Sequence, residues 1–251
     1  MSHDDATAAV EIATLAGARL VEVRDGGGAA AELKAAGDAA SHRIIADELA
    51  RRFPTDAVLS EEAADDSDRL TNRRVWIVDP LDGTREFSEP PRDDWAVHVA
   101  LVEDGKLVVG AVALPAMGLT LSSAGPFVAR GELDRPPRVL VSRTRPTEHA
   151  VAVAEALGGE LVAMGSAGAK AMAVVRGEAD VYAHSGGQWE WDSAAPVAVA
   201  AAAGLHVSRL DGSPLRYNQA DAWLPDLLIC RPELASTVIE TCAAVPRTAT
   251  T

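Results

Sequence analysis

The stretch WIVDPLDGTREF, residues 76–87, is the most informative part of this sequence. Its first residues are apolar and partly β-branched, which predicts a strand buried on both faces. Pro80 fixes φ and lacks an N–H, so we expect the chain to turn there and to bring Asp79 and Asp82 to one side. The Leu81 carbonyl can then face the same point. Three hard oxygen ligands at the end of a strand suit Mg²⁺.

Gly83 and Thr84 extend this motif toward anion binding. Glycine permits close approach of the backbone, and Thr84 can begin a helix whose free N–H groups face whatever the carboxylates hold. Metal ligands beside a phosphate-binding turn imply metal-assisted phosphoryl chemistry. The alternative is a surface turn, because Asp and Gly commonly mark turns.

Two further carboxylates stand at the ends of predicted elements. The segment LSEE places Glu61 after a short strand, and WEWDSAAP places Asp192 at the start of an apolar helix. Each has an ordinary alternative, which is a solvated charge for Glu61 and a helix N-cap for Asp192. A capping carboxylate can also bind a metal, so both roles are compatible for Asp192.

The composition excludes several classes of protein. A net charge of −14 argues against a nonspecific nucleic-acid binder, and an anionic substrate would need a local metal or helix N-terminus. The N-terminal residues lack the pattern of a signal peptide, and the apolar stretch 194–205 is too short to span a membrane. Cys230 and Cys242 lack metal-ligand spacing and are too few for a disulfide framework. We expect a soluble cytoplasmic protein with reduced thiols.

The hydrophobic periodicity predicts an α+β fold of layered sheets and helices. The second half alternates strands and helices after the segment LDRPPR, which marks a boundary. We predict an N-terminal metal-binding α+β subdomain, residues 1–135, and a smaller C-terminal α/β subdomain, residues 136–251, that completes the active site. Within the first, helices are expected at 5–24 and 38–53, a buried strand at 74–80, a hairpin at 95–115 and further antiparallel sheet at 118–133.

Three motifs together resemble the inositol monophosphatase-like, Mg²⁺-dependent, lithium-sensitive phosphatases. VWIVDPLDGTREF matches the W-[IV]-[IV]-D-P-[IL]-D-G-T signature of that family, LSEE its upstream glutamate motif, and WEWDSAAP its W-D-x-A-A motif. The order and the spacings fit over about residues 5–240. The resemblance implies a layered αβαβα sandwich of the sugar-phosphatase type, with an antiparallel sheet and a second, smaller α/β subdomain.

The resemblance also implies roles for these residues. Glu61, Asp79 and the Leu81 carbonyl would hold a first Mg²⁺, and Asp79, Asp82 and Asp192 a second. The N–H groups of Gly83 and Thr84 would bind the phosphate, and a water activated by metal would attack phosphorus.

Asp38 is a further catalytic candidate. The family carries a Lys and two Asp before its second helix, one of which pairs with the motif Thr to orient water. The segment ELKAAGDAASHRII is shorter than usual, and Asp38 aligns best with the later Asp, whereas an earlier D-x-x-T element is missing. This leaves the number of metals, two or three, and the role of Asp38 open; Asp38 is an equally good helix N-cap.

The residues after the motif indicate a substrate class. Arg85-Glu86-Phe87 resembles the 3′-phosphoadenosine 5′-phosphate phosphatase branch, also called 3′(2′),5′-bisphosphate nucleotidase, of the actinobacterial sulfate-assimilation type. A bisphosphate needs a second cation, although surface solvation is the commoner fate of Arg and Lys. Trp189 could stack on adenine, but packing is the more common role, and His98 is expected to pack rather than to ligate. The predicted substrate contacts are Leu81, Asp82, Gly83, Thr84, Arg85, Ser142, Arg143, Ser166, Lys170 and Asp192, with His184 a weak candidate.

Alternatives remain at this point. A broad phosphatase of inositol 1-phosphate or fructose 1,6-bisphosphate would use the same metal site. A catalytically inactive nucleotide-binding module is disfavoured because all four carboxylates and the Gly-Thr are present. The expected partner is a small phosphorylated molecule, and the resemblance also implies a homodimer.

Overall fold

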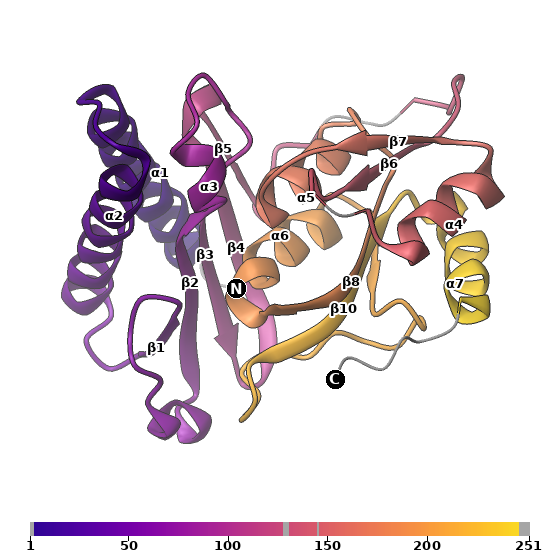
Figure 1. Cartoon of the computed structure of the whole chain (residues 1–251). Coiled ribbons are helices and arrows are strands. Elements are labelled where there is room, and N and C mark those ends of the chain that lie inside the picture. The colour runs from indigo at the N-terminus through magenta and orange to yellow at the C-terminus, as the bar shows by residue number, and fades with distance from the viewer. Residues whose placement is uncertain (1–2, 128–130, 145, 246–251) are drawn as a thin grey trace.

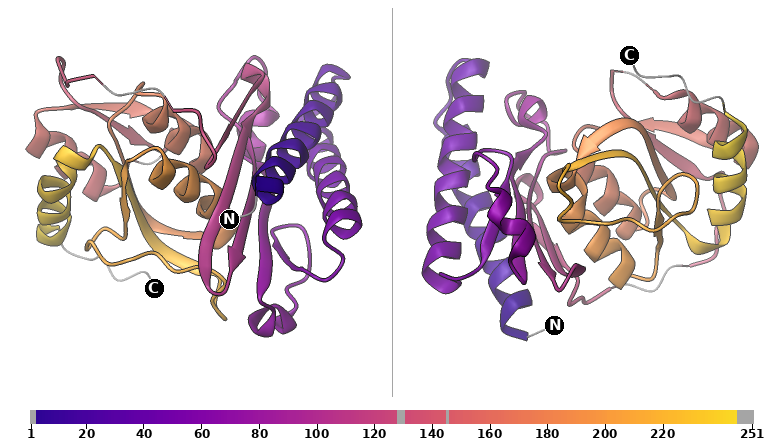
Figure 2. Two further views of the ribbon diagram at one scale, coloured as in Figure 1. Left: turned by 180° about the vertical axis from the view of Figure 1, so that it is seen from behind. Right: turned by 90° about the horizontal axis from the view of Figure 1, so that it is seen from below.

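The computed structural model of the protein describes residues 3–127, 131–144 and 146–245. Helices and sheets alternate in layers, with paired helices, a sheet, a central pair of helices, a second sheet and outer helices in turn (Figure 1). Figure 2 shows the same layering from behind and from below. The predicted α+β layered sandwich is therefore confirmed.

The first sheet has the strand order β1-β2-β3-β4-β5. β1 pairs in parallel with β2, and the other pairs are antiparallel. Helices α1 (His3–Asp25) and α2 (Ala30–Arg52) cover its outer face (Figure 1). The strands are β1 (Ala57–Ser60), β2 (Arg74–Asp82), β3 (Ala96–Glu103), β4 (Lys106–Leu114) and β5 (Leu119–Ser122), with short helical turns η1 (Ser67–Thr71), α3 (Thr84–Phe87) and η2 (Pro115–Met117) between them.

The second sheet has the order β7-β6-β8-β10-β9. Helices α5 (Ala167–Val175) and α6 (Glu190–Ala202) lie between the two sheets, and α4 (Glu148–Leu157) and α7 (Ala235–Ala244) lie on the far side (Figures 1 and 2). The boundary predicted at 135/136 falls between β5 and β6 and stays a prediction. The strands are β6 (Arg138–Val141), β7 (Glu160–Ala163), β8 (Val181–Trp189), β9 (His206–Ser208) and β10 (Trp223–Cys230), and η3 (Pro232–Leu234) precedes α7.

Small side chains set the distance between the layers. α6 packs on the first sheet at Gly110, where a Cβ would lie 2.6 Å from the Ala195 carbonyl oxygen and 2.6 Å from the Ala198 Cβ. Aromatic residues make up only 4% of the chain, so the core is filled by close approach of alanine-rich helices rather than by large rings. This packing fixes the start of α6, and with it Asp192, against the first sheet.

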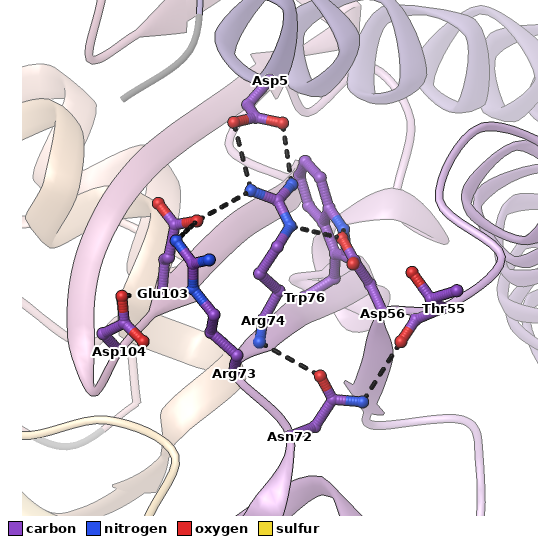
Figure 3. Close-up of polar contacts among 9 residues, drawn as sticks. All are labelled: Asp5, Thr55, Asp56, Asn72, Arg73, Arg74, Trp76, Glu103 and Asp104. Atoms are coloured by element: carbon purple, nitrogen blue, oxygen red, sulfur yellow. Dashed lines mark hydrogen bonds and ion pairs between the residues drawn. The ribbon is translucent and has the colours of Figure 1, made fainter.

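An ion-pair cluster holds the start of β2, away from the carboxylates at its other end. The Arg74 guanidinium pairs with Asp5 of α1 at 2.8 Å and with Asp56 before β1 at 2.9 Å. Asp56 also accepts a hydrogen bond from Trp76 Nε1 at 2.9 Å (Figure 3). Three segments distant in sequence are thereby joined at one end of the strand.

Three predicted boundaries differ from the structure. α2 begins at Ala30 rather than Asp38, because its alanine-rich first turns favour helix and Gly37 is tolerated where the helix packs on Phe87. β2 does not turn at Pro80 but continues to Asp82, with a register irregularity that accommodates the missing N–H. β8 runs on to Trp189 and α6 starts at Glu190, two residues before Asp192.

Other expectations have mixed outcomes. The hairpin of β3 and β4 around Asp104-Gly105 is confirmed. The further sheet predicted at 118–133 is limited to β5 among the described residues, and residues 128–130 lie outside them. Cys230 and Cys242 are buried free thiols, as expected. No helix of the described ranges combines the length and apolar character that a membrane span requires.

Candidate active site

Three carboxylates converge where β2 ends and α6 begins. Asp79 and Asp82 come from β2 and Asp192 from the first turn of α6, and one ligand oxygen of each lies within 4.8 Å of the others. Burial, together with the charges of Asp82, Glu61 and Asp192, raises the pKa of Asp79 well above its usual range. Burial and the charge of Asp82 raise the pKa of Asp192 to about 7. Acids crowded in this way fit a divalent cation, because its charge would offset both the burial and the mutual repulsion.

The second half of the chain orients Asp82. Its Oδ2 accepts hydrogen bonds from Ser166 Oγ at 2.5 Å and from the Gly168 N–H at 2.6 Å, and its Oδ1 accepts one from the Ala167 N–H at 3.1 Å. All three donors stand at the start of α5. Burial raises the pKa of Asp82, but these bonds and the contact with His98 outweigh it and lower the pKa to about 2. Asp82 is therefore held as a carboxylate of fixed orientation.

His98 of β3 lies behind the carboxylates and is fully buried. Its Nδ1 is 3.0 Å from the Trp191 carbonyl oxygen and its Nε2 is 3.2 Å from Asp82 Oδ2. Both neighbours are acceptors, so the geometry favours the imidazolium, and the pKa of His98 is raised by these contacts although burial opposes them. A Cβ on Gly168 would stand 2.0 Å from Nε2, so only glycine fits there. His98 packs against the site, as expected.

Glu61 and Asp38 approach the same corner from the other side. Glu61 follows β1 in a turn, and its charge helps to raise the pKa of Asp79. Although the residue as a whole is exposed, desolvation of the carboxyl and the neighbouring charges raise the pKa of Glu61. Asp38 lies inside α2, so the N-cap interpretation is wrong. Burial and the charge of Glu62 raise the pKa of Asp38 to about 6, whereas Lys34 lowers it.

The backbone after Asp82 forms a tight corner. Gly83 has φ of 83°, a conformation that favours glycine, and a Cβ there would lie 3.0 Å from Ser166 Cβ and 3.2 Å from the Asp94 carbonyl oxygen. Thr84 begins the single turn of α3, and its Oγ1 donates to the Leu81 carbonyl at 3.0 Å. The Leu81 carbonyl keeps a second lone pair for another partner.

The predicted substrate cations are already engaged. Arg143 pairs with Glu86 at 2.6 Å and with Glu89 at 2.9 Å, and Arg85 pairs with Glu89 at 3.2 Å. Arg143 and Arg85 thus meet through one shared carboxylate, that of Glu89.

Lys170 is buried, and its Nζ donates to the carbonyl oxygens of the three residues that precede α5, the shortest bond being 2.5 Å to Ser166. Burial lowers the pKa of Lys170. Ser166 lies on Asp82, as described above. Ser142 is the outlier among the predicted contacts, since its hydroxyl bonds only Thr144, at 3.4 Å, among the described contacts.

Sequence reasoning missed the partners that these residues find across the chain. Glu86 is buried, and Gly165 is required beside it, since a Cβ at Gly165 would lie 2.3 Å from the Glu86 side chain. The motif Arg85-Glu86-Phe87 indicates the charges of Arg85 and Glu86 but not the residues that they contact. Trp223, 34 residues beyond Trp189 in sequence, pairs with it in the register of β8 and β10, which no local pattern indicates.

Comparison with known proteins identifies the family to which the chain is similar. The family model described as "Inositol monophosphatase family" matches residues 3–245. A Mycobacterium leprae protein named 3′-phosphoadenosine 5′-phosphate phosphatase is 50% identical over 245 residues, covering 92% of this chain and 90% of that protein. A Mycobacterium tuberculosis protein of the same name is 53% identical over 212 residues, with coverage of 80% and 78%. The crystal structure of CysQ from Bacteroides thetaiotaomicron matches with a TM-score of 0.76 and 27% identity, covering 91% of this chain and 97% of that one.

Proposed function

Because the chain belongs to the inositol monophosphatase family, we propose that it is a Mg²⁺-dependent phosphatase that converts 3′-phosphoadenosine 5′-phosphate to AMP and phosphate. The observation that carries the proposal is the convergence of Asp79, Asp82 and Asp192 within 4.8 Å. The substrate follows from the names of relatives that are 50% and 53% identical. Clearing this by-product would serve sulfate assimilation in the cytoplasm.

The proposed ligands fall into two overlapping sets. Glu61, Asp79 and the Leu81 carbonyl would hold one Mg²⁺, and Asp79, Asp82 and Asp192 the other. When bound, the ions supply Lewis acidity that activates water and offsets the charge of the phosphate. The site residues contribute orientation, because Asp82 is fixed by the start of α5 and Asp192 Oδ2 accepts the Trp189 N–H at 2.6 Å.

The remaining residues would bind the phosphate and handle protons. We assign the N–H groups of Gly83 and Thr84 to the phosphate oxygens, since the corner at Gly83 is open only to glycine. Asp38, with its pKa raised to about 6, can accept a proton near neutral pH. Lys170 lies near Asp82, and Arg143 is paired with Glu86. Because neither cation is free, each would attract a second phosphate through its positive potential rather than through a direct contact.

The test is phosphate release from 3′-phosphoadenosine 5′-phosphate, inositol 1-phosphate and fructose 1,6-bisphosphate, measured side by side with Mg²⁺ and then with added Li⁺. We expect faster phosphate release from the nucleotide than from the sugar phosphates, and we expect Li⁺ to inhibit this activity. Equal or better activity on the sugar phosphates would refute the substrate assignment and leave the metal site intact. No activity on any of the three would favour a binding module. Sedimentation velocity of the same sample tests the proposed homodimer.

A further inference from the structure

Three of the five tryptophans of this aromatic-poor chain gather at the start of α6. Trp189 and Trp191 are stacked, with ring centroids 5.2 Å apart and planes at 14°, and Trp223 meets Trp189 edge-on at 5.2 Å. The other two, Trp76 and Trp95, are fully buried. A chain that packs its core with alanine thus places most of its indole rings at one point.

This tryptophan cluster, Trp189, Trp191 and Trp223, is not enclosed by the core. Trp189 and Trp223 are each 43% exposed. Trp189 is thus half-buried and packs on Trp191 and Trp223, as expected, while part of its ring stays open to solvent. A backbone feature keeps Trp223 in place, because Gly187 has φ of 87° and a Cβ there would lie 1.7 Å from the Trp223 ring. Contiguous exposed apolar surface is typical of ligand-binding and interaction sites, whereas single exposed apolar residues are ordinary.

The tryptophan cluster is joined directly to the carboxylates. The link runs through the backbone: the main-chain N–H of Trp189 donates to Asp192 Oδ2 at 2.6 Å, and the Trp191 main-chain carbonyl oxygen lies 3.0 Å from His98 Nδ1, whose ring contacts Asp82. β8 and β10 run side by side to this point (Figure 1). A substrate whose phosphate lies at the carboxylates therefore has the indoles within reach of its other end.

We propose that the exposed indole surfaces of Trp189 and Trp223 stack on the nucleobase of the substrate and so select nucleotides over sugar phosphates. This rests on the proposed function, since it concerns the same site. An uncharged contact suits a chain of net charge −14, because stacking adds affinity for an anionic substrate without a further cation. It also explains how a base can be recognised where Arg143 and Lys170 are already paired.

The experiment compares substrates that differ only in the base, 3′-phosphoadenosine 5′-phosphate and ribose 3,5-bisphosphate. Trp189→Leu should raise KM for the nucleotide about tenfold, equivalent to about 1.4 kcal/mol, and leave KM for the abasic compound unchanged. Trp189→Tyr, which keeps an aromatic face, should recover most of the affinity. Leu161→Ala is the matched control, because Leu161 is 41% exposed on β7 and lies outside the tryptophan cluster.

Three results would overturn the proposal. Equal losses on both substrates would show that Trp189 acts only through Asp192, and a shift from dimer to monomer in Trp189→Leu would show that the surface contacts a second copy. A binding assay with AMP, in which quenching of tryptophan fluorescence is the readout, separates this proposal from the proposed function. If the wild type does not hydrolyse the nucleotide, the function fails, whereas AMP binding weakened about tenfold by Trp189→Leu still supports stacking. Absence of AMP binding refutes it.

Discussion

Replacing Arg74 with methionine should destabilise the protein without altering its chemistry. The Arg74 guanidinium neutralises Asp5 and Asp56, whose side chains are each only 7% exposed, so Arg74→Met leaves two buried carboxylates without a cation (Figure 3). Removing one partner of a buried pair costs about 3–5 kcal/mol. Arg74 itself is 21% exposed, so water can enter, and we expect the lower end, about 3 kcal/mol.

Thermal unfolding is the assay, with the neighbouring arginine as control. For a chain of this length, a loss of about 3 kcal/mol corresponds to a fall in Tm of about 6–12 °C. Arg73 pairs with Glu103 and Asp104 but is 68% exposed, so Arg73→Met should cost less than about 1 kcal/mol. Below both transitions, kcat/KM should match the wild type, because Arg74 lies at the opposite end of β2 from Asp79.

Equal Tm shifts for the two variants would refute this reasoning, since burial would then not distinguish the pairs. A fall in kcat/KM for Arg74→Met at a temperature where it is fully folded would show that the start of β2 also sets the geometry of its far end.

Asp79→Asn should abolish Mg²⁺-dependent phosphate release and yet raise Tm in EDTA, because it removes a charge from a crowded buried cluster; a lower Tm in EDTA would contradict the repulsion. Gly168→Ala should lose activity and about 1–3 kcal/mol of stability through the clash with His98, while Gly131→Ala, with nothing within 4 Å, should change neither kinetics nor urea unfolding. Metal-free protein should lose stability as pH rises from about 4 to 7, because the pKa of Asp192 is raised from 3.8 to about 7 and the folded state then binds the extra proton. Asp192→Asn should flatten that slope in thermal scans from pH 4 to 8, and an unchanged slope would assign it to other groups.

The sequence was sufficient for the features that local chemistry determines. A buried β-branched run followed by Asp, Pro and Gly has few structural solutions, and the resemblance of the three motifs to the family is confirmed by the comparisons. The convergence of Asp79, Asp82 and Asp192 was likewise anticipated and is observed. Their roles as metal ligands stay a prediction, as do the substrate contacts.

What the sequence did not reveal depends on contacts between distant segments. The helix expected at 38–53 begins earlier and includes Gly37, where a Cβ would lie 2.8 Å from the Phe87 ring, so this glycine serves packing inside α2. Arg143 looked like a free cation, whereas Glu86 and Glu89, more than fifty residues earlier, occupy both of its terminal nitrogens. The local sequence does not indicate such pairings, because the charge and size of a residue do not determine which distant residue it contacts.

The anchoring of Asp82 has a consequence for biosynthesis. Ser166, which fixes this carboxylate, emerges from the ribosome 84 residues after it, and Asp192 emerges later still. The first sheet can thus form on the nascent chain while its acidic corner is still incomplete and its carboxylates are free to turn toward water. The cluster of carboxylates is complete only when α5 and α6 have docked on the first sheet. A cation bound by all three carboxylates would therefore require that most of the chain has been synthesised and folded.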